Sequence, residues 1–324
     1  MHDSNLRFTC DNAGIIKSIK QLGQFSSNPC QNELESRMTI VDILKQTRGV
    51  SNWNGPDDKG TGFNWSSELP LGEWDGIAPE YTPPQKRIQV DGSGKIRILL
   101  LNHLGMRGIM PDSIGNLASL NQFSVSHNRL THLPDSIGQL SSLIALWADT
   151  NQLTHIPDSI GNLASLALLY ANDNQLSTIP VSFCNLKSLA QLTLHSNQLT
   201  ALPDTFGNLT SLTGLWVHTN QLSALPDSIG NLSSLTKLYV GLNQLTRIPD
   251  TIGNLKSLTD LYVNSNQLSQ LPDWIRNLTS LTTLYVHTNP VTSTQSGKDE
   301  AKRRFGRDGL KIYVEEIYNL MQYL

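Results

Sequence analysis

The sequence has few charged residues, few cysteines and no long apolar run. Asp, Glu, Lys and Arg make up 16% of the 324 residues, and the net charge is −3. A nucleic-acid-binding surface needs a basic face, so this balance argues against such a partner. No stretch approaches the roughly 18 consecutive apolar residues of a membrane span. We therefore predict no nucleic-acid partner and no membrane span.

The three cysteines, Cys10, Cys30 and Cys184, are odd in number and fit no metal-binding spacing. We interpret them as reduced thiols in a reducing compartment, with a Cys10–Cys30 bridge as the alternative. The first residues lack an apolar stretch of signal-peptide length. A cytoplasmic location is therefore predicted. The alternative is a secreted microbial effector that uses residues 1–37 as its export signal.

A phrase of twenty-three residues recurs through most of the chain, and its clearest copy is LTGLWVHTNQLSALPDSIGNLSS, which starts at Leu212. A fixed period of this size is typical of a solenoid, in which each repeat forms one coil of a continuous stack. One asparagine marks the same place in each of eight copies: Asn128, Asn151, Asn174, Asn197, Asn220, Asn243, Asn266 and Asn289.

The residue types within one copy predict how a coil is built. Leu215 and Val217 alternate with Trp216 and His218, which is the period of a strand with its Leu and Val pointing inward. The amide of Asn220 can bind backbone groups of adjacent coils, so stacked copies should form a buried asparagine ladder. The fold class is therefore α/β: a curved parallel sheet on the concave face and short helical or 3-10 turns on the convex face.

An aspartate follows the proline of most copies, where the convex segment begins. We predict that it caps a short helical turn, and we prefer this reading to a calcium site. The column comprises Asp112, Asp135, Asp158, Asp204, Asp227, Asp250 and Asp273.

Composition and periodicity divide the chain into four segments. Residues 1–37 are predicted to be a flexible leader, 38–96 an N-terminal cap, 97–291 about nine coils, and 292–324 a C-terminal capping helix. The helix is inferred from apolar residues at helical spacing between Leu310 and Leu324. Asp91-Gly92-Ser93-Gly94-Lys95 resembles a phosphate loop only weakly, and a hairpin turn between 87–90 and 95–101 explains it better.

The pattern LxxLxLxxNxLxxLPDSIGNLxS is similar to the leucine-rich repeat motif. Its LPxxIGNL phrase resembles that of the plant Ras-group-related repeat proteins and the repeats of Roco proteins. The run Glu73-Trp74-Asp75-Gly76-Ile77 resembles the N-terminal cap of plant-receptor-type repeat proteins, without their paired cysteines. The resemblance implies a role in signalling or host interaction. We predict a monomeric scaffold with no catalytic activity, cofactor or metal.

The strand position between the two inward residues should form an outward column on the concave face. It reads Ser124, Trp147, Tyr170, Thr193, Trp216, Tyr239, Tyr262 and Tyr285, and it spans roughly 34 Å at strand spacing. A second column, two residues further along, includes His195, His218 and His287. Aromatic anchors beside polar groups are typical of binding surfaces. Cross-strand stacking that merely stabilises the sheet is the competing explanation.

We predict that a protein partner binds this face. The predicted partner-binding residues are Trp147, Tyr170, His195, Trp216, His218, Tyr239, Tyr262, Tyr285 and His287. His195 and His218 should be neighbours, but no third metal ligand is evident, so no metal site is predicted. A glycan-binding module is the second hypothesis, because Trp and Tyr also stack on sugars. No catalytic constellation stands out.

Overall fold

The computed structural model describes residues 88–315 without a break, together with residues 39, 40, 42, 43, 46, 77, 78, 85 and 86. The strands are β1 (Ile77–Ala78), β2 (Gln85–Lys86), β3 (Ile88–Val90), β4 (Ile96–Leu100), β5 (Arg107–Ile109), β6 (Gln122–Ser124), β7 (Arg129–His132), β8 (Ala145–Trp147), β9 (Leu168–Tyr170), β10 (Gln191–Thr193), β11 (Gly214–Trp216), β12 (Lys237–Tyr239), β13 (Asp260–Tyr262), β14 (Thr283–Tyr285) and β15 (Lys311–Tyr313).

Between residues 88 and 315 the helical elements are nine 3-10 helices and one α-helix. They are η2 (Asp112–Asn116), η3 (Asp135–Gln139), η4 (Asp158–Asn162), η5 (Val181–Asn185), η6 (Phe206–Asn208), η7 (Asp227–Asn231), η8 (Asp250–Asn254), η9 (Asp273–Asn277), η10 (Pro290–Thr292) and α2 (Gln295–Phe305).

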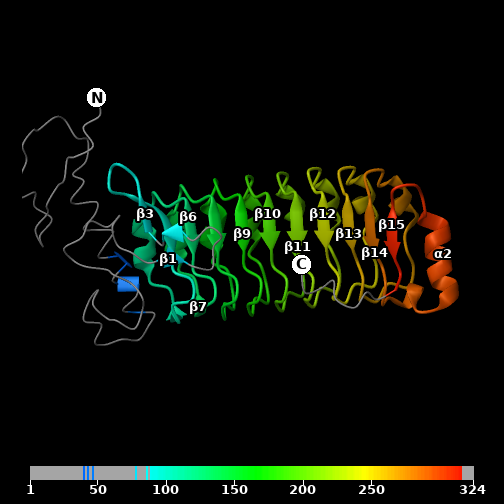
Figure 1. The fold of residues 1–324 in the computed structure, drawn as a ribbon, viewed down its shortest axis with the longest axis horizontal. Coiled ribbons are helices and arrows are strands. Elements are labelled where there is room, and N and C mark those ends of the chain that lie inside the picture. Colours follow the sequence, from blue (N-terminus) through cyan, green and yellow to red (C-terminus); the bar gives the residue numbers. More distant parts are fainter. Residues whose placement is uncertain are drawn as a thin grey trace, which may run out of the picture.

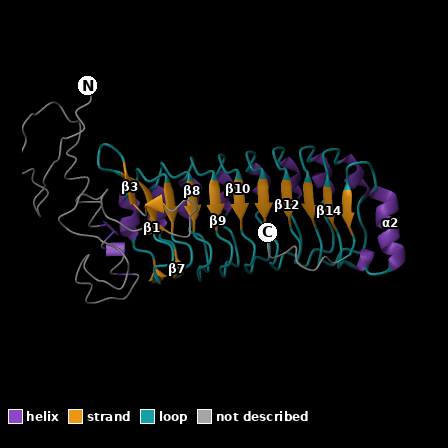
Figure 2. Ribbon diagram, in the orientation of Figure 1, coloured by secondary structure: helices purple, strands orange, loops and turns teal. Residues whose placement is uncertain are grey.

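One long sheet runs the length of the molecule (Figure 1). It has eleven strands in the order β15-β14-β13-β12-β11-β10-β9-β8-β6-β4-β3, and every pair is parallel except β3–β4. The register advances by one repeat per strand: Leu192 pairs with Leu215, and Leu215 with Leu238. Figure 2 shows the short helices behind the strands. This arrangement confirms the predicted solenoid with a parallel sheet and 3-10 turns.

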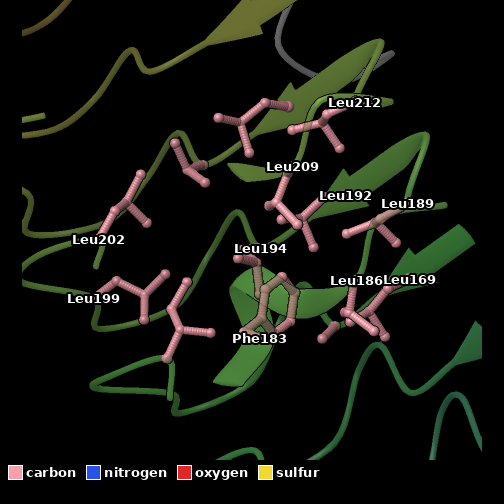
Figure 3. Close-up of a cluster of buried hydrophobic side chains, with 14 of the residues drawn as sticks. Leu169, Phe183, Leu186, Leu189, Leu192, Leu194, Leu199, Leu202, Leu209 and Leu212 are labelled. Carbon is pink, nitrogen blue, oxygen red and sulfur yellow. The ribbon is translucent and has the colours of Figure 1, made fainter. Parts of the chain in front are cut away.

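A single apolar core fills the space between the sheet and the 3-10 turns. It extends from Ile40 to Val314 as one cluster, with the middle residue of β6 and of each strand from β8 to β14 buried. Figure 3 shows part of it, in which Phe183 from η5 lies among leucines that include Leu192, Leu194 and Leu212. Each coil therefore closes its core against its neighbours rather than alone.

The asparagine ladder runs through the coils at the end of the strands. Asn220 Oδ1 accepts a hydrogen bond from the Leu199 N–H at 2.9 Å, and its Nδ2 donates to the carbonyls of Leu194 and Val217 at 2.9 and 3.1 Å. The same pattern recurs at Asn128, Asn151, Asn174, Asn197, Asn243, Asn266 and Asn289. Every one of these side chains is buried, at 9% exposure or less.

The residue before each ladder asparagine has a left-handed backbone, although none is glycine. Their φ angles lie between 52° and 56°: His127, Thr150, Asp173, Ser196, Thr219, Leu242, Ser265 and Thr288. Such a conformation is strained for β-branched and bulky residues and persists only where the surroundings determine it. The hydrogen bonds of the following asparagine provide that constraint, so the strand ends in the same way in every coil.

The prediction that the repeated aspartates cap the 3-10 turns is wrong. In six turns the capping position is held by the preceding proline, and no side chain makes a capping hydrogen bond. The aspartates Asp112, Asp135, Asp158, Asp227, Asp250 and Asp273 lie one residue later, within the first turn. Asp204 precedes the shorter η6, which begins at Phe206. Apart from Asp273, which binds Arg304, these carboxylates act at most through the positive end of the turn.

The glycine of IGNL lets successive turns approach closely. A Cβ on Gly138 or Gly161 would overlap the backbone carbonyl of the serine in the next turn. Cys184 occupies the equivalent place in η5; it is a free, buried thiol, and burial raises its pKa. The next turn, η6, has three residues instead of five. The turn that carries a side chain in place of the glycine is thus followed by the shorter turn.

The C-terminal end differs from the predicted helix. Residues 310–315 do not form one: Lys311–Tyr313 is β15, which pairs in parallel with β14. The helix lies earlier, as α2, within the segment 292–324 that was assigned to the capping helix but before the apolar residues from which it was inferred. The sheet edge at β14 offers unpaired backbone groups, and pairing with them outweighs the local helical spacing. The predicted helix beyond residue 315 lies outside the described residues.

Two arginines, one in α2 and one just after it, bind the C-terminal end to the last repeat through hydrogen bonds. Arg304 donates to the Leu271 carbonyl at 3.1 Å and to the Asp273 carboxylate at 2.7 Å. Arg307 donates to the carbonyls of Leu278 and Arg276. These bonds satisfy carbonyls at the end of η9, where cations are favoured.

At the N-terminal end, β3 and β4 form the predicted hairpin. The Asp91 carboxylate accepts hydrogen bonds from Ser93, Lys95 and Arg97 across its turn, which explains this turn without a phosphate. Ile40 and Ile43 are fully buried in the common core. The assignment of residues 38–96 as a cap stays a prediction. The leader, Cys10, Cys30 and residues 73–76 lie outside the described part of the chain.

Candidate binding face of the sheet

The outward columns lie on one surface, which we call the sheet face: the side of the sheet opposite the core. Tyr239, Tyr262 and Tyr285 form a cluster of their own, with Trp216 and Tyr313 packed against it, separate from the apolar interior. The strand register places each column residue directly beside the next, from Ser124 and Trp147 onward. The aromatic side chains therefore share one face, as the alternation predicts.

The C-terminal half of the column is a closed stack of tyrosines. Ring centroids are 4.0 Å apart for Tyr239–Tyr262, 4.2 Å for Tyr262–Tyr285 and 4.1 Å for Tyr285–Tyr313. The first three are only 5–9% exposed. This burial corrects the expectation of an open column, because the ring faces are covered by one another. Tyr313, which sequence analysis assigned to a helix, extends the stack.

Burial also changes the acidity of the stacked phenols. It is the main cause that raises the pKa of Tyr262, and the neighbouring Tyr239 hydroxyl raises it further. The pKa of Tyr285 is raised in the same way, by burial and then by Tyr262 and Tyr313. These phenols stay neutral throughout the physiological range and act as hydrogen-bonding groups, not as acids.

The N-terminal half of the column is more open. Trp147 and Tyr170 are half-buried neighbours on β8 and β9, with ring centroids 6.3 Å apart and planes inclined by 20°. The Tyr170 hydroxyl donates to Gln191 Oε1 at 2.9 Å, which fixes the ring. Two large aromatic rings at nearly the same inclination are thus held side by side within reach of a ligand.

Trp216 is also half-buried but is held differently. Its ring lies over Gly214, where an added Cβ would overlap the six-membered ring. It meets Tyr239 edge-on, with centroids 5.7 Å apart. The glycine in β11 therefore has a packing function, and Trp216 closes the exposed end of the tyrosine stack.

His195 and His218 are brought together as predicted, with ring centroids 4.5 Å apart and planes inclined by 13°. Burial, and then the proximity of His195, lowers the pKa of His218 to about 4. Burial also lowers the pKa of His195, although the charges of Asp173 and Asp149 oppose this shift. The pair is therefore uncharged at neutral pH. His287 lies apart from it, with its ring edge-on to Tyr285.

Two carboxylates stand beside the open aromatic pair, and sequence analysis did not include them among the binding residues. Asp149 follows Trp147 by two residues and so faces the same side. It accepts a hydrogen bond from Ser126 Oγ at 2.5 Å, and its side chain is 18% exposed. Asp173 is exposed, at the end of the next coil's strand. The presence of acidic residues at outward positions was the signal that could have identified them.

Neither a metal centre nor a membrane segment is found in the part of the chain that the structure describes. No group of three or more His, Cys, Asp or Glu side chains there is arranged to hold a metal ion. None of the helices within those residues has the length and apolar character of a membrane-spanning segment.

Comparison with known families gives two matches. Residues 148–199 match the model of the leucine rich repeat, and residues 215–300 match the model of a leucine-rich repeat region. Comparison with curated proteins gave no significant match. The repeats and the solenoid together show that the chain has the leucine-rich repeat fold.

Solved structures of similar fold include plant receptors. The ectodomain of the Arabidopsis thaliana membrane receptor kinase GASSHO1/SCHENGEN3, in complex with CASPARIAN STRIP INTEGRITY FACTOR 2, is 27% identical with a TM-score of 0.65, over 78% of this chain and 29% of that one. The PEPR1–AtPEP1 complex is 26% identical with a TM-score of 0.59, over 78% of this chain and 38% of that one. The plant peptide hormone receptor RGFR1 in complex with RGF2 is 29% identical with a TM-score of 0.51, over 63% of this chain and 41% of that one.

The chain spans less than half the length of these three solved chains. The whole receptors therefore contain regions that have no counterpart in this alignment. What carries over directly is the repeat scaffold.

Proposed function

We propose that this leucine-rich repeat protein is a non-catalytic scaffold that binds a protein or peptide partner on its sheet face. The observation that carries the proposal is the half-open pair of Trp147 and Tyr170, which is held rigidly by the sheet. Large aromatic side chains on a rigid surface lose little entropy on binding and contribute most of the energy of many interfaces. The similar receptor structures, each solved with a peptide or protein factor, support the same function.

The contact surface that we propose is narrower than the full column. It comprises Trp147, Tyr170, Trp216 and the His195–His218 pair. Tyr239, Tyr262 and Tyr285 support it from one side, since their ring faces are covered. A monomeric chain with a role in signalling, either cytoplasmic or as an exported effector, remains the accompanying hypothesis for its cellular setting.

The test is selection of a random peptide display library on the full chain, followed by affinity measurement with Trp147→Ala. We expect the variant to lose at least about tenfold in affinity, as for a central aromatic contact, with little change in melting temperature. The matched control is Val181→Ala in η5, which removes an exposed apolar side chain (67% exposed) from the opposite side of the core. Unchanged affinity together with a lower melting temperature would show that Trp147 is only structural.

A glycan ligand is the second candidate, favoured by the near-parallel Trp147 and Tyr170 rings and by the polar groups at their edge. A glycan array probed with the same two variants distinguishes the two functions. Saturable sugar binding that Trp147→Ala abolishes and Val181→Ala preserves would favour the glycan.

A further inference from the structure

We propose that the open end of the sheet face recognises a cationic side chain, preferentially arginine, on an extended segment of the partner. The recognising groups are the rings of Trp147 and Tyr170 and the carboxylates of Asp149 and Asp173. This inference rests on the proposed function and specifies the chemistry of its ligand.

The first argument is charge complementarity. Between residues 121 and 219 the only Lys or Arg residues are Arg129 and Lys187. Arg129 begins β7, outside the main sheet, and Lys187 donates to the carbonyls of Cys184 and Asn208 behind the core. The outward positions of β6 and β8–β11 therefore carry negative charge with no permanent cation beside it.

The second argument is the state of Asp149. Its carboxylate is largely shielded from solvent, and its hydrogen-bond donors are the neutral hydroxyls of Ser126 and Thr150. Within the described residues, the basic group that approaches this carboxylate is His127, whose Nε2 lies 3.9 Å from Asp149 Oδ2. A carboxylate in such surroundings gains more from an arriving cation than a fully solvated one does.

The third argument is the order of groups along the strand. Trp147 and Asp149 are two residues apart on the same side, so their Cα atoms are separated by about 6.6 Å along the strand. A long basic side chain that lies in this direction places its aliphatic part on the Trp147 ring and its charged end at the carboxylate. A planar guanidinium stacks on aromatic rings and binds a carboxylate through two parallel hydrogen bonds, which favours arginine over lysine.

His195 and His218, the buried histidine pair of this face, do not oppose a cation at neutral pH. His195 and His218 have lowered pKa values because they are buried. Burial, and then the charge of Asp149, raises the pKa of Tyr170. Its phenol stays neutral and its ring keeps the electron-rich face that attracts a cation.

The experiment analyses the peptides selected on the full chain. We expect enrichment of arginine, a loss of at least about tenfold in affinity when that arginine is replaced by citrulline, its neutral isostere, and weaker binding at high salt. The paired change Asp149→Asn and Asp173→Asn should cause a similar loss. The matched control, Asp135→Asn and Asp158→Asn, alters net charge equally on the 3-10 turns of neighbouring coils and should leave affinity unchanged. Melting curves verify that all variants fold.

Two results would overturn the inference in different ways. Peptides that depend on Trp147 but show no basic enrichment, or tolerate citrulline, would refute the cationic ligand and leave the proposed binding function standing. A library that yields no binder, or only binders indifferent to Trp147→Ala, would count against both.

Discussion

Replacing Asn220 with alanine should lower the free energy of unfolding by about 2–4 kcal/mol, and the geometry of the ladder sets that range. The Asn220 side chain is 8% exposed. Its Oδ1 accepts the hydrogen bond of the Leu199 N–H, so alanine leaves that buried donor without a partner. An unsatisfied buried N–H costs about 1–3 kcal/mol, and the lost Nδ2 bonds add to it.

The three carbonyls that Asn220 Nδ2 binds are less vulnerable. Those of Leu194 and Val217 each accept from two asparagines, and that of His218, at 3.2 Å, also accepts from the Ser196 N–H. The Leu194 carbonyl also accepts from Asn197 at 3.0 Å, and the Val217 carbonyl from Asn243 at 3.0 Å. Both keep one partner in the alanine variant. Because these carbonyls keep a partner, the expected loss in the free energy of unfolding is smaller than four independent hydrogen bonds would give.

Asn220→Asp gives a sharper test with almost no change in shape. The carboxylate can still accept from the Leu199 N–H, but its second oxygen replaces Nδ2. That oxygen would face the Leu194 and Val217 carbonyl oxygens at about 3 Å and bring a buried charge with no cation beside it. We expect the aspartate variant to be less stable than the alanine variant at neutral pH.

The assay is urea unfolding followed by circular dichroism, with hydrogen exchange by mass spectrometry to locate the loosened coils. Repeat arrays do not always unfold in one cooperative step, so the local measurement is required. Asn231→Ala is the matched control, because Asn231 ends η7 in the same coil and is exposed. The reasoning is refuted if Asn220→Ala costs no more than Asn231→Ala, or if the aspartate variant is the more stable of the two.

Three further outcomes are expected. Gly138→Ala should lower the melting temperature by several degrees because its Cβ would enter the backbone of the next coil, whereas Gly92→Ala, which faces open space, should have little effect. The lowered pKa of His218, about 4, means that the unfolded chain binds the proton more tightly. Its stabilising contribution, at most about 3 kcal/mol, is therefore complete above pH 6.5 and is lost as the pH falls towards 4. A plot of the urea unfolding midpoint against pH should be flatter between pH 4 and 6.5 for His218→Gln than for the unchanged protein. Arg307→Ala should cost about 1–3 kcal/mol by releasing the last carbonyls, and faster amide exchange near Leu281 would show it.

The regular part of the fold could be predicted because the residue type at each repeat position follows from one physical requirement. Leu215 and Val217 alternate with Trp216 and His218, and the structure buries the first two and turns the others outward. The asparagine at a fixed interval gave the coil boundaries. These features depend on local alternation and on a period, both of which are visible in one sequence.

The exposure of the aromatic column could not be predicted in the same way. Tyr170 and Tyr262 occupy equivalent positions, yet Tyr170 is half-buried and Tyr262 is 9% exposed. The difference arises from their neighbours: Tyr262 has a tyrosine on each side, whereas Thr193 follows Tyr170. Accessibility is thus a property of three adjacent strands rather than of one residue.

The C-terminal end was mispredicted for a related reason. Apolar residues from Leu310 onward have helical spacing, but the edge of β14 and the ring of Tyr285 were already in place to receive a strand. Tyr313 stacks on Tyr285 with planes inclined by 11°. Non-local pairing of this kind overrides local periodicity and leaves no trace in it.

The sharing of each ladder carbonyl by two asparagines has a consequence for how such a molecule can change in length. Each coil makes the same hydrogen bonds to the next coil as it makes to the previous one. Duplication or deletion of one whole coil would therefore conserve every hydrogen bond of the series. The array would grow or shrink by about 4.8 Å at a time. Any alteration by a fraction of a coil would break the series. The distance between Trp147 and the C-terminal tyrosines can therefore change only by whole coils. The spacing of contacts along a partner would change in the same fixed steps.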